Sequence, residues 1–505
     1  MSYGMNRFST RTKLIAGALA LVLAGVSHAS GTQVGGGATL PSIGYVGANA
    51  ASNLQVFGSV TGTGVDPNSL FGVYAQQTGN PGVSYCLTGS GAGKDILAAP
   101  ITLTVNGVST SFSVQNACTK NSVGTVSGFG ADATISGVSV GRSDLTQPNF
   151  AGADAPLAAS DYANYQTGHG SAAFPTQFPA VAGAVAIAFN VLDTNGVQVT
   201  SSATGLSDSM ICKIFAGVVT NWNDPTIASA FTVSSGAAMP NAAINVQYRS
   251  DGSGTSFGFS NHLSAVCPSF VNSSGQTAFF QASQSFTNVV TGFPSASPVV
   301  PGVLVSIPSN WTGSSGNASV ANAVKNTASS LGYVETANAL AIAPNLKFAN
   351  VNSASPITNF GTTLNLLSSE VVYNEVISGT NNSNGTPALE AISSISGVTP
   401  PPTGSTCIAL VNPSVYAKTA KGGFLPLGTY PIVAISYLLS HAQGVEASDL
   451  TNTQNLVNAP YNTTITGSVT TIGSGTGLAF LNPAPSTGGG AFSVTAAGAC
   501  VNSGN

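Results

Sequence analysis

The sequence predicts an α/β fold in two lobes, and three observations lead to this prediction. First, the centre of the chain mixes two periodicities, because residues 206–215 and 254–266 have helical spacing whereas residues 244–248 alternate as a strand does. Second, about 476 residues would follow a removable N-terminal segment, which exceeds one comfortable hydrophobic core. Third, the strand-like segments 181–189 and 331–335 are suited to cross between two lobes.

The first 29 residues are typical of a secretory signal peptide. Three cations precede an apolar run over residues 14–26, and Ser27-His28-Ala29 forms a small-x-small cleavage site. No cysteine follows this run as a site for a lipid anchor, and no later apolar run is long enough to cross a membrane. The mature chain is therefore expected to begin at Ser30 and to be a soluble periplasmic or secreted protein.

The charge balance argues against a nucleic-acid partner. Without the three cations of the signal segment, nine of the 12 Lys and Arg remain against 16 Asp and Glu, a net charge of −7. Only 6% of residues are charged, 43% are hydrophobic and 59 are glycine, so uncharged polar residues must cover most of the surface. Such a composition fits a weakly charged exported protein or an adhesive, self-assembling one.

Six cysteines in an exported chain predict three disulfides. Metal binding is not expected, because no Cys-x-x-Cys occurs and the three mature histidines, His169, His262 and His441, are far apart in sequence. Six cysteines permit 15 connectivities, so the pairing stays open. The pairs suggested by chain order are Cys86 with Cys118, Cys212 with Cys267, and Cys407 with Cys500.

Residues 248–257 carry the clearest indication of a binding site. A strand-like stretch precedes them and helical spacing follows, so Ser253-Gly254-Thr255 falls where a strand turns into a helix. The first N–H groups of a helix lack intrahelical partners and lie at its positive end, which suits an anion. Arg249 adds a two-pronged charged contact. The predicted ligand is small, anionic and tetrahedral.

Two other glycine-rich segments bear on this prediction. Residues 35–41 combine three glycines with Thr39 and with Pro41, which suits a first helical turn and brings the Thr39 hydroxyl to a second positive helix end. Residues 88–94 match a nucleotide P-loop only in part, because its first glycine is a threonine here and an aspartate follows the lysine. ATP binding is therefore rejected.

Asp154, within Gly152-Ala153-Asp154-Ala155-Pro156, is an acid that would repel an anion unless the anion carries a proton. Phosphate near neutral pH still carries one, and an ionised Asp154 can accept a hydrogen bond from it. Fully ionised sulfate has no proton to donate, so its oxygen lone pairs would face those of the carboxylate and be repelled. One carboxylate can thus favour phosphate over sulfate.

With these segments in order, the chain resembles the substrate-binding proteins of phosphate-specific ABC transporters, and especially their DING-like branch. The resemblance implies a two-lobe periplasmic-binding-protein (type II) fold with hinge strands, no cofactor, and phosphate held between lobes that close by hinge motion. Asn221 to Asp224 is expected to be structural. The matching segments are residues 35–41, 89–91, 153–157, 221–225, 249–255, 332–335 and 430–432.

The resemblance also implies the roles of individual residues. Asp251 is expected to hold the guanidinium of Arg249 in place and to offset part of its charge, and Asp154 is expected to accept the phosphate proton. The residues expected to contact phosphate are Thr39, Leu40, Ser90, Asp154, Arg249, Ser253, Gly254 and Thr255.

The lobe boundaries are expected at the two strand-like segments that could cross between lobes. Lobe 1 is expected to comprise residues 30–182 and 335–505, and lobe 2 residues 183–334. Lobe 1 would include a β-rich insertion at about 95–148 and a C-terminal extension at about 459–505.

Both additions differ in composition from the rest of the chain. In the insertion, residues 101–105 and 108–114 alternate on either side of Asn106-Gly107, which predicts a hairpin. A second β-like stretch spans about 459–481. The chain also departs from the family it resembles at two points, because Thr32-Gln33-Val34 replaces the residues that name the branch and Ala153 stands where a serine is usual.

The function predicted is high-affinity binding of inorganic phosphate for uptake through an inner-membrane ABC permease, without catalysis. One alternative is a serine phosphatase, because Gly254-Thr255-Ser256-Phe257-Gly258 matches G-x-S-x-G and His441 follows. That match lacks the strand leading straight into the first glycine. The other alternative is an extracellular structural or adhesive protein that retains a phosphate site and self-assembles through its insertions.

Overall fold

The computed structural model describes residues 31–59, 61–105, 107–120, 127–271, 275–292, 301–483 and 494–503. The expected signal peptide, residues 1–29, lies outside these residues. Within them, no helix has the length and apolar character needed to span a membrane.

Strands and helices are interspersed along the chain, and the predicted α/β class is confirmed. The strands are β1 (Gln33–Gly36), β2 (Gln55–Val56), β3 (Val83–Cys86), β4 (Ile101–Val105), β5 (Val108–Phe112), β6 (Thr134–Ile135), β7 (Val138–Ser139), β8 (Ala151–Ala153), β9 (Pro175–Asn190), β10 (Thr200–Ser201), β11 (Phe231–Thr232), β12 (Asn245–Arg249), β13 (Phe270–Val271), β14 (Thr277–Ala278), β15 (Thr312–Ser314), β16 (Ser330–Glu335), β17 (Lys347–Ala349), β18 (Leu364–Leu366), β19 (Val371–Tyr373), β20 (Glu375–Ile377), β21 (Leu389–Ala391), β22 (Ala409–Val411), β23 (Val433–His441) and β24 (Leu478–Pro483).

The helices cover the sheet on both sides. They are α2 (Ser42–Val46), α3 (Leu70–Gln76), α4 (Ser90–Leu97), α5 (Ala159–His169), α6 (Asp208–Phe215), α7 (Gly254–Val266), α8 (Phe286–Val290), α9 (Asn317–Asn326), α10 (Thr336–Ile342), α11 (Pro413–Tyr416), α12 (Leu450–Asn458), α13 (Thr463–Thr466) and α14 (Val494–Ala499). Short 3-10 helices are η1 (Ala48–Ala51), η2 (Ala228–Ala230), η3 (Ser368–Glu370), η4 (Ile392–Ser394) and η5 (Ala459–Tyr461).

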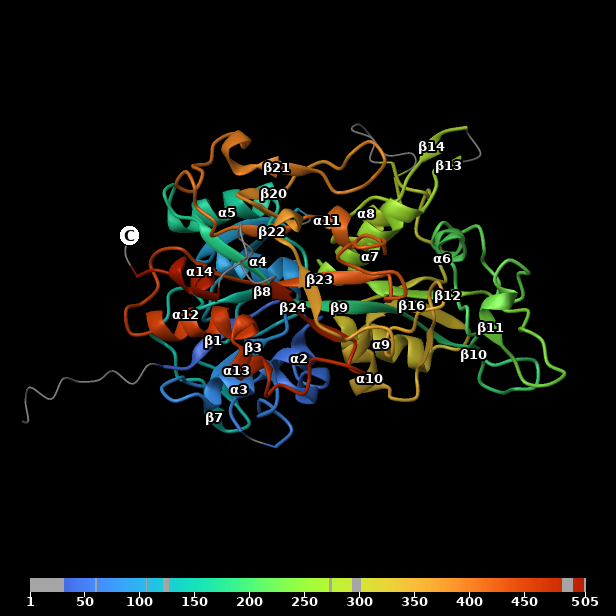
Figure 1. Cartoon of the computed structure of the whole chain (residues 1–505), viewed down its shortest axis with the longest axis horizontal. Helices are drawn as coiled ribbons and strands as arrows, with labels where there is room; N and C mark the ends of the chain where they lie inside the picture. The colour runs from blue at the N-terminus through green and yellow to red at the C-terminus, as the bar shows by residue number, and fades with distance from the viewer. Residues whose placement is uncertain are drawn as a thin grey trace, which may run out of the picture.

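One mixed sheet with the order β15-β12-β16-β9-β23-β8 runs through the centre of the molecule (Figure 1). Strand β9 is a run of small and branched apolar residues, and all its residues except Asn190 are buried. A strand covered on both faces is expected to have such a continuous apolar sequence.

Strand β9 changes its partners near its middle. From Pro175 to Ala184 it pairs with β23, and from Val185 to Asn190 it pairs with β16. Strand β24 also pairs with the first half, and β17 with the second. The two halves of the sheet therefore share this strand, while the lobe boundaries at residues 182 and 335 stay a prediction.

On the β8 side, a three-stranded sheet β1-β3-β2 meets the central sheet where Gly37 pairs with Gly152. Gly37 has φ +116°, and a Cβ there would lie 2.3 Å from the carbonyl oxygen of Gly152. Only glycine fits this approach, which brings residues 38–40 next to the end of β8.

On the other side, parallel pairing places β12 between β15 and β16. In Figure 1, α7 and α8 lie on one side of these strands and α9 and α10 on the other. Trp222 is fully buried, donates its Nε1–H to Ser329 O at 2.9 Å and packs against Phe231. These contacts give the segment the structural role expected of it, and truncation of such a residue costs about 3–5 kcal/mol.

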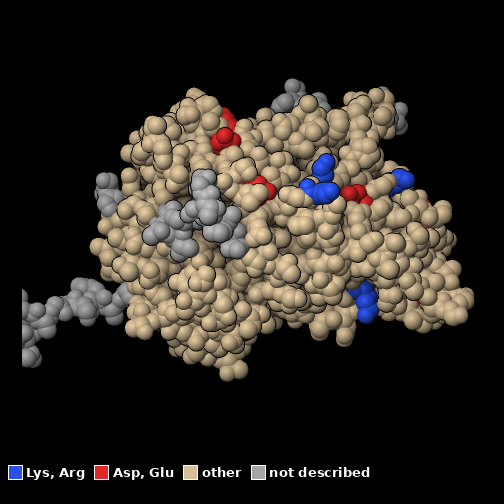
Figure 2. All heavy atoms as spheres, viewed as in Figure 1, with Lys and Arg blue, Asp and Glu red and all other residues tan. Residues whose placement is uncertain are grey.

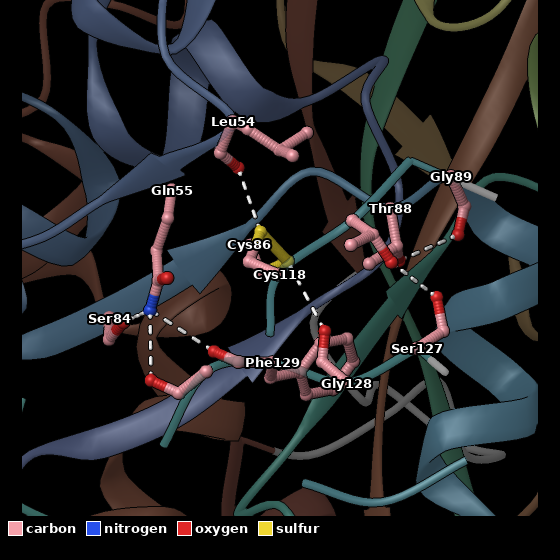
Figure 3. The surroundings of a disulfide bond; sticks show 12 residues. Leu54, Gln55, Ser84, Cys86, Thr88, Gly89, Cys118, Ser127, Gly128 and Phe129 are labelled. Carbon is pink, nitrogen blue, oxygen red and sulfur yellow. Dashed lines mark hydrogen bonds between the residues drawn. A yellow bond between two sulfur atoms is a disulfide. The ribbon is translucent and has the colours of Figure 1, made fainter. Parts of the chain in front are cut away.

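The predicted hairpin in the insertion is present as the antiparallel pair β4–β5. Gly107 lies in its turn with φ +81°, and Asn106 lies outside the described residues. Figure 3 shows how the insertion is anchored: Cys118 is bonded to Cys86 of β3, and Phe129 O accepts from Gln55 Nε2 of β2 at 3.1 Å.

The prediction of a β-like stretch over 459–481 is wrong for most of that range. The chain forms η5 and α13 before β24 begins at Leu478. Asn462 starts α13 because its Oδ1 accepts from the N–H groups of Thr464 at 3.0 Å and Ile465 at 3.3 Å. A local cap thus outweighs the β propensity of the threonines.

Three disulfides are present, and they join the pairs that chain order suggested. The bonds are Cys86–Cys118, Cys212–Cys267 and Cys407–Cys500, with sequence separations of 32, 55 and 93. Loops of this length stabilise the fold by about 3–5 kcal/mol per bond in the chain-entropy account.

Charged atoms are sparse on the face shown in Figure 2, where a few isolated Lys, Arg, Asp and Glu side chains interrupt an uncharged surface. This agrees with a charged fraction of 6%. Several charged groups are instead buried in pairs, such as Arg142 with Asp449 at 2.6 Å.

Candidate functional site

The predicted turn from strand to helix is confirmed at residues 249–254. Strand β12 ends at Arg249 and helix α7 begins at Gly254, with Ser253 as its N-cap. The Ser253 hydroxyl accepts from Ser256 N at 3.1 Å, so its own hydrogen is left to donate. A glycine and a hydroxyl group thus stand at the positive end of a 13-residue helix.

Arg249 enters this turn as a buried cation. Its Nε donates to Asp251 Oδ1 at 2.6 Å, and its Nη1 donates to Thr255 Oγ1 at 3.3 Å. Burial works to raise the pKa of Asp251, but the charge and hydrogen bonds of Arg249 hold that pKa below its usual value. The pair is therefore ionised, and the guanidinium is fixed in one orientation.

Asp154 directly follows β8 and faces this turn. Its Oδ2 accepts from the hydroxyl of Ser90 at 3.3 Å and from Leu40 N at 3.4 Å. The other oxygen, Oδ1, is buried and has no partner within hydrogen-bonding geometry among the described residues. Burial raises the pKa of Asp154 to about 6, against the lowering effects of the neighbouring Ser436 hydroxyl, the Arg249 charge and the bonds to Oδ2.

The segments around Asp154 and Arg249 are in direct contact. A Cβ on Gly254 would lie 2.3 Å from Asp154 Cβ, so only glycine permits this approach. Gly91 N donates to Gly252 O at 3.1 Å. The contacts bring the starts of α4 and α7 and the end of β8 around one point.

Thr39 and Leu40 come from the chain that leads into α2. The helix begins at Ser42, and Pro41, which was predicted in the first turn, is its N-cap. Thr39 Oγ1 is bonded to Asn317 Nδ2 at 3.1 Å, and the same nitrogen lies 3.0 Å from Thr255 Oγ1. The structure therefore gathers, through direct contacts or shared neighbours, Thr39, Leu40, Ser90, Asp154, Arg249 and Thr255.

Asn317 is a residue that the sequence analysis missed. It is fully buried at the start of α9, and its Oδ1 accepts from Glu335 N at 3.1 Å. An asparagine at a predicted helix start normally suggests a cap, so its type gave no signal of a central position. Only the fold brings residues 39, 255 and 335 to it.

Lys120 was missed for a similar reason. It belongs to the insertion, yet its Nζ donates to Ser319 Oγ at 2.8 Å and to Ser315 O at 3.3 Å beside α9. Lys120, Thr39 and Asn317 line a cavity of about 190 Å³. Burial lowers the pKa of Lys120, while the nearby charge of Asp251 opposes this shift.

Lys94, in the rejected P-loop match, is buried and occupied elsewhere. It forms an ion pair with Asp161 and donates to Pro156 O at 3.3 Å. Its ammonium is thus part of the packing between α4 and α5. Among the described residues, no group of three or more His, Cys, Asp and Glu is placed to hold a metal ion.

Relatives of this chain include proteins whose names refer to phosphate binding or to phosphatase activity. The chain is 35% identical over 128 residues to a phosphate-binding protein PstS of Pasteurella multocida, which covers 25% of this chain and 33% of that protein. It is 27% identical over 299 residues to an alkaline phosphatase L of Pseudomonas aeruginosa, covering 59% and 61% of the two chains. The chain thus spans from about a third to about three fifths of the length of these relatives.

A solved phosphate-binding protein from Stenotrophomonas maltophilia has 20% sequence identity and a TM-score of 0.47, over 85% of this chain and 84% of that one. The model of the PBP superfamily domain matches residues 69–387, which is more than half of the chain. On this match, the chain belongs to the PBP superfamily.

Proposed function

We propose that this protein binds inorganic phosphate between the turn that precedes α7 and the segment of Asp154, and that it delivers phosphate to an inner-membrane ABC permease. The ligand would lie among the N-termini of α4 and α7, the Thr39 hydroxyl and the guanidinium of Arg249. These groups are donors, which suits an anion. The names of the relatives support the same ligand.

The observation that carries the proposal is the free oxygen of Asp154. A buried carboxylate oxygen that accepts no hydrogen bond from the described residues is costly, because burial separates it from water. A ligand that presents both acceptor oxygens and one hydroxyl removes that cost. Monohydrogen phosphate has this pattern, and sulfate does not.

Titration calorimetry of ligand-stripped protein with phosphate and with sulfate, at neutral pH, tests the proposal. Tight binding of phosphate with little response to sulfate is expected. Absence of phosphate binding, with the protein folded by circular dichroism, would refute it.

We also propose that the protein acts by binding alone. The name of one relative, alkaline phosphatase L, points to hydrolysis, and Ser256 is the nucleophile that the G-x-S-x-G match would supply. However, Ser256 Oγ is buried and bonded to Tyr333 Oη at 2.6 Å. His441 is engaged with Tyr165 and with Pro148 O, so it does not serve as the base for Ser256.

A periplasmic location and a permease partner are parts of the same proposal. Fractionation of cells that express the full chain tests the first, and phosphate uptake by cells lacking the protein tests the second. Self-assembly through the insertion at 95–148 stays a prediction, which sedimentation of the purified protein checks.

A further inference from the structure

Asn317 joins three parts of the chain that are distant in sequence. It is fully buried at the first position of α9. Its Nδ2 contacts Thr39 Oγ1 at 3.1 Å and Thr255 Oγ1 at 3.0 Å, and its Oδ1 accepts from Glu335 N at 3.1 Å. Because a backbone N–H can only donate, the last contact fixes which end of the carboxamide is oxygen.

The carboxamide nitrogen therefore faces both threonines as a donor. A hydroxyl group has one hydrogen and two acceptor sites, and Nδ2 has two hydrogens, one for each threonine. Thr255 Oγ1 also accepts from Arg249 Nη1 at 3.3 Å, so both of its acceptor sites are used. Its single hydrogen is then left to donate elsewhere.

We propose that Asn317 is a positioning residue that turns the hydroxyls of Thr39 and Thr255 into donors directed at the bound anion. This inference rests on the proposed function. Without such a group, each hydroxyl can rotate and present a lone pair to an anion oxygen, which is repulsive. At Thr255, Asn317 and Arg249 together occupy both lone pairs and remove that choice. At Thr39, Asn317 occupies one of the two lone pairs and leaves the hydrogen free to donate.

Two substitutions separate this role from a packing role. In Asn317→Ala both threonines lose this donor, and Thr255 keeps only that of Arg249, so the phosphate Kd should rise about tenfold, as expected for two modest hydrogen bonds. In Asn317→Asp a carboxylate of nearly the same shape accepts from both hydroxyls and turns their hydrogens away from the anion. The Kd should then rise about a hundredfold or more, because two donors become repulsive and a negative charge is added.

The test compares how much each of the two substitutions raises the phosphate Kd. A residue that only fills space should tolerate the nearly isosteric Asp better than Ala, so a milder effect of Asn317→Asp would overturn the proposal. Asn322→Asp is the matched control, because Asn322 is exposed on the same helix and its substitution adds the same charge. This control should leave the Kd unchanged.

A mutant cycle with the threonines gives a second test, which holds even where Asn317→Asp does not fold. In a Thr39→Val, Thr255→Val background, Asn317→Ala should weaken phosphate binding no further, because no hydroxyl remains to be oriented. An undiminished loss in that background would overturn the proposal. If the unsubstituted protein fails to bind phosphate, the proposed function itself fails instead.

Discussion

Asp251 holds the guanidinium of Arg249 through two parallel hydrogen bonds, at 2.6 Å from Nε to Oδ1 and at 2.5 Å from Nη2 to Oδ2, and both side chains are 1% exposed. Coupling of this kind leaves the remaining hydrogens of the guanidinium for a ligand. It also makes the arginine depend on its partner, because an unpaired buried charge is strongly unfavourable.

Asp251→Asn is therefore expected to destabilise the unliganded protein by about 3–5 kcal/mol. Phosphate should restore more stability in the variant than in the wild type, because the anion then becomes the main counter-charge of Arg249. Chemical denaturation with and without phosphate measures both effects. Asp144→Asn is the control, since Asp144 pairs with Arg142 but is 60% exposed, and it should have little effect.

Asp154→Asn should narrow the preference for phosphate over sulfate, because the amide can donate to sulfate where the carboxylate repels it. In the wild type, protonation of Asp154 as pH falls through about 6 should act in the same direction. Competition between the two anions at pH 5 and pH 8 measures this. A selectivity ratio that is the same in variant and wild type would remove Asp154 from the role.

His441 is expected to make the fold sensitive to acid. Burial, followed by the nearby His169, lowers its pKa to about 3, and its two ring nitrogens contact Tyr165 Oη and Pro148 O. The unfolded chain takes up the proton near pH 6.5, so this contribution is complete above that pH and is lost as pH falls toward 3. Over this pH range, the free energy of unfolding of His441→Gln should fall less steeply than that of the wild type. Urea unfolding at several pH values measures both, and equal slopes against pH would show that His441 is not the source of the acid sensitivity.

Lys120→Met should speed the release of phosphate, because Lys120 links the insertion to Ser315 and Ser319 beside the site. Because exposed contacts of this kind are weak, the rate of phosphate release should rise at most about fivefold, and by less at high salt. Stopped-flow displacement measures the rate. Lys325→Met, which removes a cation at the other end of α9, is the control and should leave the rate unchanged.

Ser256→Ala should leave unchanged any hydrolysis of an aryl phosphate by the purified protein. The Ser256 hydroxyl is bonded to Tyr333 Oη and has no histidine beside it among the described residues. A rate that disappears in the variant, with phosphate affinity retained, would establish a serine mechanism. Steady-state assays on the two proteins decide the point.

The parts of the site that are local in sequence could be predicted from it. The strand end at Arg249 and the helix start at Gly254 lie within six residues, and the rules for helix starts apply to them directly. The continuous apolar sequence of β9 likewise identified a buried strand.

Contacts between distant segments could not be predicted in the same way. Asparagine is common at helix starts, so the residue type of Asn317 does not indicate a role in the site. Its contacts with residues 39, 255 and 335 arise only when the chain folds. Within the stretch over 459–481, residues 463–466 form a helix that begins at a capping asparagine. The periodicity of apolar residues does not show where a side chain caps a helix.

Strand β9 has a consequence for how the protein unfolds. Because its residues pair with β23 in one half of the sheet and with β16 in the other, both halves lose a ladder once this strand is removed. We therefore expect the two halves to unfold as one cooperative unit despite the length of the chain.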